Sequence, residues 1–187
     1  HLGPAAPAQA VAPEVADVDG NTEERRGTVS IFNGPAPVVQ RLGSDDDENG
    51  VVALWLKDLV ADGVKPHEIG IFVRSVEEID RAVHAVDKTG LPYKVLDEHV
   101  ETVHGFVSIC TMHLAKGLEF RAVAVMACDD EVIPSQVRIE TVADDADLQE
   151  VYDTERHLLY VACTRARDHL LVTSGGPASE FLDDFLG

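Results

Sequence analysis

The chain has 187 residues, of which 45% are hydrophobic and only 5% aromatic. This length suits one domain with a substantial core, built mainly from Val, Leu, Ile and Ala. With 15 basic and 34 acidic residues the formal charge is −19. Such a charge argues against tight binding of nucleic acid over a broad surface, because that binding rests on neutralising phosphates with Lys and Arg. Any contact with DNA is therefore expected to be local.

Apolar runs in the sequence are too short to span a bilayer, and no signal-peptide pattern is present. The three cysteines, Cys110, Cys128 and Cys163, are far apart and each lies among apolar residues. That arrangement favours reduced, buried thiols. The His, Cys and Glu residues between 98 and 113 match no standard zinc spacing, so no metal site is predicted. We expect a cytoplasmic protein without membrane contact.

The amino-terminal residues 1–27 are rich in Ala, Pro and charge and have no sustained apolar period. A flexible tail or linker is predicted there. The domain itself is predicted over residues 28–187. It is expected to begin with two short strands, at 28–32 and 38–42, which flank the turn-forming sequence Asn-Gly-Pro.

A helix, a strand and a second helix are predicted next. Apolar residues between 51 and 60 recur at helical spacing after an acidic loop, until an Asp-Gly pair ends the pattern. The compact apolar run IGIFV at 69–73 predicts a strand. Ser75 and Glu78 have the spacing of a capping box and open the second helix, which ends at a Thr-Gly pair. A short strand follows at 93–96.

The second half of the chain repeats this alternation. A strand at 106–111 leads into a turn or short helix at 113–119. The apolar run RAVAVMA at 121–127 is typical of a strand buried on both faces of a parallel sheet. An irregular stretch precedes a long helix, roughly 147–166, and a strand at 169–173 and a short terminal helix complete the pattern. Strands that alternate with helices predict an α/β domain with a mostly parallel sheet.

The stretch TMHLAKGLEF, residues 111–120, contains a Lys-Gly pair after a strand. A P-loop needs Gly, four residues and then Gly-Lys-Ser/Thr, so that backbone N–H groups surround the phosphates. No such sequence occurs in the chain. The stretch offers instead a compact polar set, Thr111, His113, Lys116 and Glu119, expected at the carboxyl end of a strand, where open α/β sheets bind ligands. The same residues also fit a purely structural role, with Glu119 paired to Arg121.

The stretch YDTERHLLYVACTRARDHLLV, residues 152–172, places Arg165 and Arg167 after a helix and before a strand. An Arg at a helix end is ordinarily a solvated partner of the helix dipole. An Arg at this place could equally reach an anionic group at the edge of the sheet. Glu155 and Arg156 could be a surface pair of little energetic weight.

Together these two stretches resemble the last motifs of superfamily 1 DNA helicases of the UvrD/Rep/PcrA group. That family has a strand, Thr-x-His-x-x-Lys-Gly-Leu-Glu-Phe, another strand, and later Glu-Arg-x-Leu-x-Tyr-Val-Ala-x-Thr-Arg-Ala. IGIFVRS at 69–75 and VIPS at 132–135 are similar to further family elements. The resemblance covers roughly residues 69–175.

The resemblance implies a RecA-like, P-loop NTPase-type domain that lacks the P-loop itself. It would be the second of two such domains, with ATP and Mg²⁺ bound between them, mainly by an N-terminal RecA-like domain, and with single-stranded DNA crossing both. By the family pattern Arg165 is the catalytic arginine that reaches the γ-phosphate, and Glu119 lies near the ribose and phosphates. Thr111 and His113 correspond to residues that touch the DNA backbone. The remaining nucleotide-facing positions are Lys116, Gly117 and Thr164.

The chain departs from the family in three places. About ten residues stand where the family carries a large inserted domain, between 96 and 106. The family's upstream Tyr-Arg-Ser element, with a second phosphate-reaching arginine, is not found in residues 1–68, and His157 replaces a common Arg.

Family membership suggests a helicase or translocase that moves 3′ to 5′. The isolated chain is expected to be inactive, because it lacks the P-loop lysine and the magnesium ligands. The alternative is a non-catalytic interaction module, derived from a helicase, that docks another protein through its acidic surface. The presence of both Gly-Leu-Glu and Thr-Arg-Ala favours the motor.

Overall fold

The computed structural model describes residues 35–185 of the chain. Its strands are β1 (Val38–Arg41), β2 (Ile69–Val73), β3 (Tyr93–Val95), β4 (Val107–Thr111), β5 (Phe120–Val125) and β6 (Ala166–Ser174). The α-helices are α1 (Asp45–Ala61), α2 (Ile79–Asp87), α3 (Gln136–Glu140) and α4 (Asp145–Cys163). The 3₁₀ helices are η2 (Pro66–Glu68), η3 (Val76–Glu78), η4 (Met112–Leu114) and η5 (Glu180–Phe185). The predicted tail 1–27 and the predicted strand 28–32 lie outside the described residues.

The strands form one six-stranded sheet in the order β1-β6-β5-β2-β4-β3, and every pairing in it is parallel. The predicted α/β fold with a mostly parallel sheet is confirmed. All strands of a parallel sheet begin at one edge, here called the amino edge, and end at the opposite one, the carboxyl edge. Each connection between parallel strands must therefore return across a face of the sheet.

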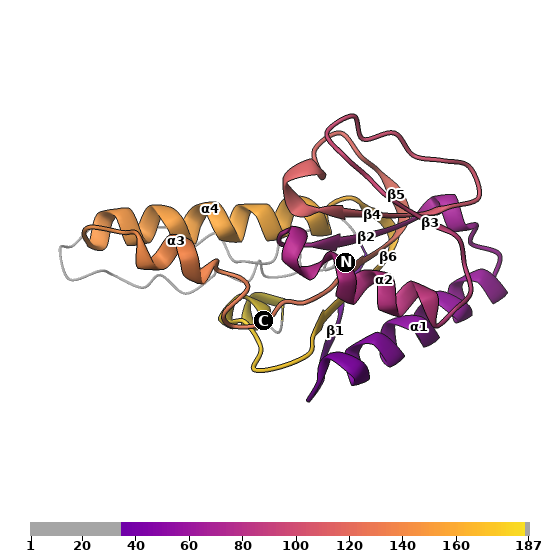
Figure 1. Cartoon of the computed structure of the whole chain (residues 1–187), viewed down its shortest axis with the longest axis horizontal. Helices are drawn as coiled ribbons and strands as arrows, with labels where there is room; N and C mark the ends of the chain where they lie inside the picture. The colour runs from indigo at the N-terminus through magenta and orange to yellow at the C-terminus, as the bar shows by residue number, and fades with distance from the viewer. Residues whose placement is uncertain (1–34, 186–187) are drawn as a thin grey trace, which may run out of the picture. The chain divides into compact units, whose positions relative to one another are not determined.

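Helices cover both faces of the sheet (Figure 1). Side chains of β2 alternate between them, since successive strand residues point to opposite faces. Ile71 packs with apolar residues of α1 and α2, whereas Phe72 belongs to the core on the side of α4, η4 and η5. All five residues of β2 are buried, as its apolar sequence predicts for a central parallel strand.

The acidic run 45–48, predicted to be a loop, is the first turn of a helix, and a second helix also begins at acidic residues. The Ser44 side chain accepts the N–H of Asp47 at 3.1 Å and caps α1, whose first turn is the acidic run 45–48. The Asp144 side chain accepts the N–H of Asp147 at 2.9 Å and caps α4. Carboxylates are favourable there because the amino-terminal end of a helix carries partial positive charge.

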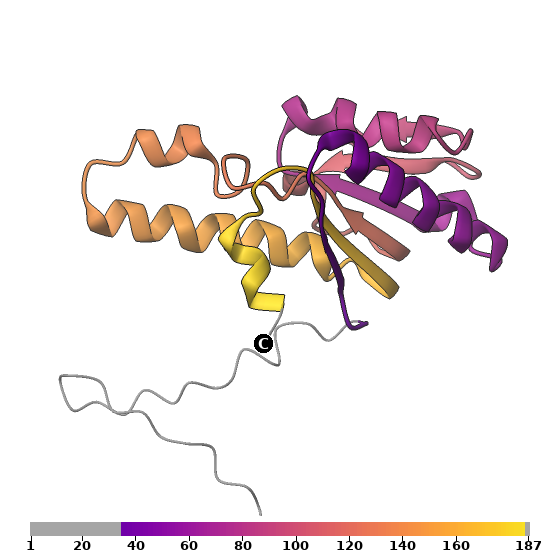
Figure 2. The ribbon, with the colours of Figure 1, turned by 90° about the horizontal axis from the view of Figure 1, so that it is seen from below.

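The carboxyl-terminal third differs from prediction in its boundaries. Helix α4 ends at Cys163, earlier than predicted, and β6 already begins at Ala166. Helix α3 lies in the stretch predicted to be irregular, and the terminal helix η5 is a 3₁₀ helix. At 19 residues, α4 is about 28 Å long, longer than every strand except the nine-residue β6. Its first turns and α3 run side by side past the end of the sheet (Figures 1 and 2).

The three cysteines are free and buried, as predicted. Burial raises the pKa of each thiol above its ordinary value, to about 12 for Cys110. Within residues 35–185, no helix has both the length and the apolar character needed to cross a membrane.

Gly70 in β2 allows the ring of Phe120 to pack close against its backbone, and this contact can be tested. A Cβ added to Gly70 would lie 2.5 Å from Cδ2 of Phe120, a buried ring that cannot readily move. Gly70→Ala is therefore expected to lower the free energy of unfolding by about 1–3 kcal/mol, measured by urea denaturation of the chain.

The matched control for this substitution is Gly50→Ala in α1. No neighbouring atom lies within 4 Å of an added Cβ there, so the helix preference of alanine should raise stability by up to about 1 kcal/mol. Equal effects of the two substitutions would contradict the proposed role of the Gly70–Phe120 contact.

Candidate functional site

The segment between β4 and β5 belongs to the first long motif and runs from the ends of the strands back to their starts. Residues 112–119 link β4 to β5, and these strands flank β2 on its two sides. Because both strands are parallel to β2, the link starts at the carboxyl edge and must end at the amino edge. Thr111 and His113 therefore lie at the carboxyl edge, and Glu119 lies at the amino edge. The prediction of one compact polar set is wrong, since the five residues of β2 already separate the edges by about 13 Å.

Apolar residues hold this crossing segment in place. Met112 and Ala115 are buried in the core beneath α4, while Lys116 and Glu119 remain exposed. Gly117 has a φ of +87°, which a residue with a side chain adopts only with strain. The Lys-Gly pair thus marks a left-handed turn that directs the chain into β5.

Arg165 brings the two long motifs together at the amino edge. Its Nε lies 3.1 Å from the Val161 carbonyl oxygen and its Nη2 lies 3.1 Å from Oγ1 of Thr164. Its Nη1 lies 3.4 Å from the carbonyl oxygen of Leu118, 47 residues away in sequence. The backbone carbonyl of Arg165 in turn accepts the N–H of Phe120 at 2.9 Å. The start of β5 and the end of α4 are therefore joined through this one residue.

The charge of Arg165 is available to an anion. Its hydrogen bonds go to neutral carbonyl and hydroxyl oxygens. Across residues 35–185 it forms no ion pair within 4.0 Å. Thr164 and Glu119 lie exposed beside it on the two joined segments. Arginine in this setting presents a fixed cation at the surface.

The neighbouring Arg167 is engaged differently. Its Nη2 lies 3.2 Å from Oδ2 of Asp168, which also pairs with Arg121 at 3.0 Å. Arg121 lies a further 3.9 Å from Glu68, so the pairing of Glu119 with Arg121 that the sequence allowed is not formed. The register between β5 and β6 shifts between Phe120 and Ala122. Such an irregularity changes the direction of the local side chains, as a β-bulge does.

A second polar cluster occupies the carboxyl edge, and it is centred on Glu155. The side chain of Glu155 is fully buried, so the suggestion of a weak surface pair with Arg156 is wrong. Its Oε1 accepts from Arg74 Nη2 at 2.6 Å and from Arg138 Nη1 at 2.8 Å. Its Oε2 accepts from Arg74 Nε at 2.7 Å and from the N–H of Ser135 at 3.0 Å. The carboxylate thus joins α4 to the end of β2, to α3 and to the turn before α3.

These contacts set the ionisation of Glu155. Burial by itself favours the protonated form. The hydrogen bonds and charge of Arg74, the hydrogen bond from Arg138 and the backbone N–H of Ser135 together hold the pKa of Glu155 below its ordinary value. Arg156 points elsewhere and pairs with Asp184 of η5 at 3.0 Å.

His113 completes the cluster, since its Nε2 lies 3.0 Å from Nη1 of Arg74. Burial, and then the charge of Arg74, lower the pKa of the imidazole. Sequence reasoning did not identify Arg74 and Arg138 as site residues. A signal was present for their partner, because Glu155 is an acidic residue on the otherwise apolar face of a long helix, where a charge requires a counter-ion.

A third cluster lies at the carboxyl edge on the opposite face of the sheet. Arg81 of α2 pairs with Glu48 of α1 at 3.1 Å and with Asp129 after β5 at 2.6 Å. Glu48 also accepts the N–H of Ala127 at 3.3 Å. Burial raises the pKa of Glu48 to about 7 despite the opposing charge of Arg81. None of these residues belongs to the motifs, and their contacts join α1 and α2 to the sheet.

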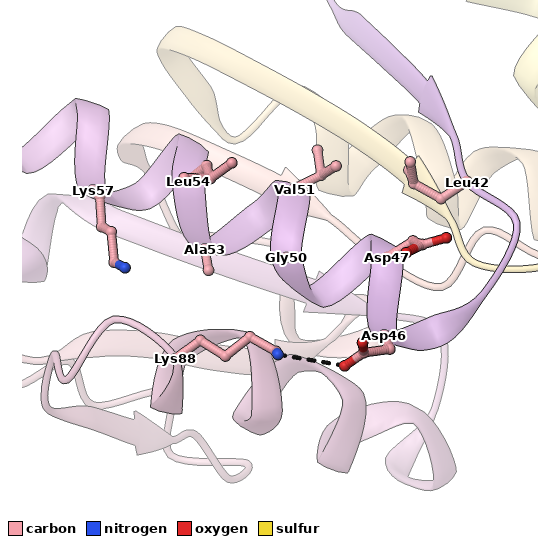
Figure 3. Close-up of a pocket in the computed structure, with 9 residues that line it drawn as sticks. All are labelled: Leu42, Asp46, Asp47, Gly50, Val51, Ala53, Leu54, Lys57 and Lys88. Atoms are coloured by element: carbon pink, nitrogen blue, oxygen red, sulfur yellow. Dashed lines mark ion pairs between the residues drawn. The ribbon is translucent and has the colours of Figure 1, made fainter.

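An open surface depression lies over α1, away from both motif segments (Figure 3). Val51 and Leu54 line it, and Lys88 pairs with Asp46 at its rim at 3.3 Å. No predicted site residue contributes to it. In the described part of the chain, no three His, Cys, Asp or Glu side chains are grouped to hold a metal ion.

Residues 98–175 match the family model of the UvrD-like helicase C-terminal domain. This part of the chain is similar to UvrD-like helicase C-terminal domains. The matched range contains both long motifs and Glu155, whereas Arg74 lies before it.

Three relatives show the same similarity. YjcD of Bacillus subtilis, provisionally named an ATP-dependent DNA helicase, is 46% identical over 72 residues, which is 37% of this chain and 9% of YjcD. The ATP-dependent DNA helicase PcrA of Staphylococcus aureus is 40% identical over 76 residues, 41% of this chain and 10% of PcrA. The ATP-dependent DNA helicase UvrD1 of Mycobacterium leprae is 39% identical over 77 residues, 41% of this chain and 9% of UvrD1. The chain thus matches only about a tenth of the length of each relative.

A solved structure supports the fold. The crystal structure of the C-terminal domain of a possible DNA helicase from Lactobacillus plantarum WCFS1 superposes with a TM-score of 0.59 and 22% identity. The superposition covers 84% of this chain and 87% of that one. The UvrD-like motifs therefore lie on a fold that is shared well beyond them.

Replacing Glu155 with Gln tests the central cluster. The substitution removes the counter-charge of buried Arg74, and is expected to lower the free energy of unfolding by about 3–5 kcal/mol at neutral pH. Because the folded pKa of Glu155 lies below its ordinary value of 4.5, the deficit should be full above that pH and shrink as the pH falls through the folded value.

The control is Glu150→Gln, an exposed glutamate on the same helix, which should change stability by less than about 0.5 kcal/mol. Urea denaturation of both variants between pH 3 and pH 8 provides the measurement. A pH-independent deficit for Glu155→Gln would show that the carboxylate charge is not what stabilises the cluster.

Proposed function

We propose that this chain is the second RecA-like motor domain of an ATP-dependent DNA helicase or translocase. In this role it completes an ATP site together with an N-terminal RecA-like domain and contacts single-stranded DNA. Support comes from the UvrD-like family match over residues 98–175 and from relatives named ATP-dependent DNA helicases. The relatives are about ten times longer than the match, which leaves room for the partner domain.

The observation that carries the proposal is the environment of Arg165. It is a cation without a counter-ion among the described residues, held against Leu118 and beside Glu119 at the amino edge. This donor set fits one side of a nucleotide: a cation for a terminal phosphate, with exposed Lys116 and Glu119 nearby. The chain has no P-loop, so the other side must come from another domain.

ATP bound with Mg²⁺ would supply the phosphoanhydride bond that is broken. The role of this chain is then electrostatic. Arg165 stabilises the negative charge that develops on the transferring phosphoryl group, as arginine fingers do. The contacts to Val161, Thr164 and Leu118 orient its guanidinium before the partner domain approaches. The isolated chain is expected to hydrolyse no ATP.

The DNA contact is proposed at the carboxyl edge, around Thr111 and His113. The crossing segment 112–119 connects this edge directly to the nucleotide side. Its packing under α4 makes it a short, stiff link, so a displacement at Glu119 is passed to His113. The 3′-to-5′ direction follows from the family alone.

Arg165→Ala is expected to reduce DNA-stimulated ATP hydrolysis by about 10³- to 10⁵-fold in the full-length protein that contains this domain. The matched control is Arg167→Ala, which removes a nearby exposed arginine already paired with Asp168 and should leave turnover within a few-fold of wild type. Similar turnover for wild type and Arg165→Ala would overturn the motor proposal and favour a docking module.

His113→Ala is expected to reduce the stimulation of ATP hydrolysis by single-stranded DNA and to leave the unstimulated rate unchanged. Titration of the full-length protein with oligothymidylate measures both quantities. His84→Ala, at an exposed site on α2, is the control. Full stimulation in the His113 variant would contradict the assignment of this residue to the DNA strand.

A further inference from the structure

Each nitrogen of the Arg74 guanidinium has a partner, and this constrains His113. Nε and Nη2 donate to Glu155 at 2.7 and 2.6 Å, and Nη1 faces Nε2 of His113 at 3.0 Å. An arginine side chain stays protonated and can only donate, so Nε2 of His113 must accept. A neutral imidazole that accepts at Nε2 carries its proton on Nδ1.

We propose that Arg74 is a positioning residue, which holds His113 as the neutral Nδ1–H tautomer so that the ring offers one N–H donor to a phosphate oxygen of a DNA strand. This inference rests on the proposed function, because the strand is the ligand assigned to His113. It adds to that function the tautomer in which His113 acts and the residue, Arg74, that selects this tautomer.

The surroundings hold Arg74 strongly enough for that role. Its side chain is 8% exposed and that of Glu155 is 0% exposed, so neither charge can leave the pair without a large desolvation penalty. Arg138 and the N–H of Ser135 occupy the remaining positions on the carboxylate. Glu155 of α4 thus fixes Nε and Nη2 of the guanidinium, and this directs Nη1 at the imidazole.

The charges that face His113 favour a neutral ring. Arg74 approaches from the end of β2 and Arg138 from α3, whereas only Glu155 of α4 opposes them. Among the charged groups that act on His113, the two guanidinium groups outnumber the one carboxylate. Attraction for a phosphate then comes from the arginines, while His113 supplies direction, since hydrogen bonds to a phosphate oxygen depend on geometry.

The tautomer can be measured without DNA. Long-range proton–nitrogen NMR correlations on the ¹⁵N-labelled 187-residue chain at pH 7.5 separate a protonated ring nitrogen from an unprotonated one. We expect a protonated Nδ1 and an unprotonated Nε2 for His113, with the signals assigned by their loss in His113→Asn. An Nε2–H ring or a doubly protonated ring would overturn the proposal.

The cause of the tautomer is tested by the double variant Arg74→Met/Glu155→Met. Removing both charges together avoids leaving one buried and unpaired, which is the usual reason that single variants of such pairs fail to fold. His113 should then shift toward the Nε2–H form, and its pKa should rise toward the ordinary value. Arg121→Met, at the amino edge, should leave the ring unchanged. An unchanged tautomer in the double variant would exclude Arg74 as its cause, and the wild-type spectrum decides the tautomer even if this variant does not fold.

The contribution of the donor is tested in the full-length protein with fluorescein-labelled oligothymidylate. The amide of Asn can place an N–H near the position of Nδ1, whereas the longer Gln places it near Nε2. His113→Asn should bind within a few-fold of wild type, and His113→Gln should bind about 10- to 100-fold more weakly, as for loss of a hydrogen bond to a charged group. The reverse order would overturn the proposal. If the wild-type protein does not bind the oligonucleotide, the proposed function fails. The NMR measurement, which needs no DNA, still tests whether Arg74 sets the tautomer of His113.

Discussion

The buried carboxylate of Glu155 is the interaction on which the carboxyl edge of this domain depends. A buried charge is tolerated only when hydrogen bonds and an opposite charge compensate its lost hydration. Here four donors from Arg74, Arg138 and the Ser135 backbone surround its two oxygens. Because these donors come from separate segments, the single carboxylate fixes the end of β2, helix α3 and helix α4 relative to one another.

The parallel sheet imposes the second constraint, which is the division of the motifs between two edges. A connection between parallel strands has to return from the end of one strand to the start of the next, along the full length of the strands. Residues 112–119 do this in one short segment, so a single motif serves both edges. The geometry explains why Thr111 and His113 precede the Lys-Gly turn and Glu119 follows it. It also joins the two edges of the domain through one short segment.

Many acidic side chains lie where positive charge compensates them, and a few cations are placed at the two edges of the sheet. The chain carries a formal charge of −19, yet many of its acids lie where they meet partial or full positive charge. The acidic run 45–48 and Asp144 lie at helix starts, and Asp184 pairs with Arg156. Arg165 at the amino edge has no ion pair among residues 35–185, whereas Arg74 and Arg138 at the carboxyl edge share Glu155. The proposed contact with a polyanion is consequently confined to small regions.

The sequence alone indicated most of the strands and helices and the resemblance to UvrD-like helicases. Uninterrupted apolar runs such as IGIFV are typical of buried parallel strands, and the two long motifs resemble those of UvrD-like helicases, so the strand positions and the resemblance could be predicted directly. The helix end near Thr164 was misplaced, because it depends on the pairing of Ala166 with Phe120 across the sheet. Only the tertiary structure decided that Glu155 is buried, that Arg74 reaches His113, and that Glu119 lies at the opposite edge from both. These facts depend on contacts between residues 39 to 81 positions apart, and local spacing carries no information about such distances.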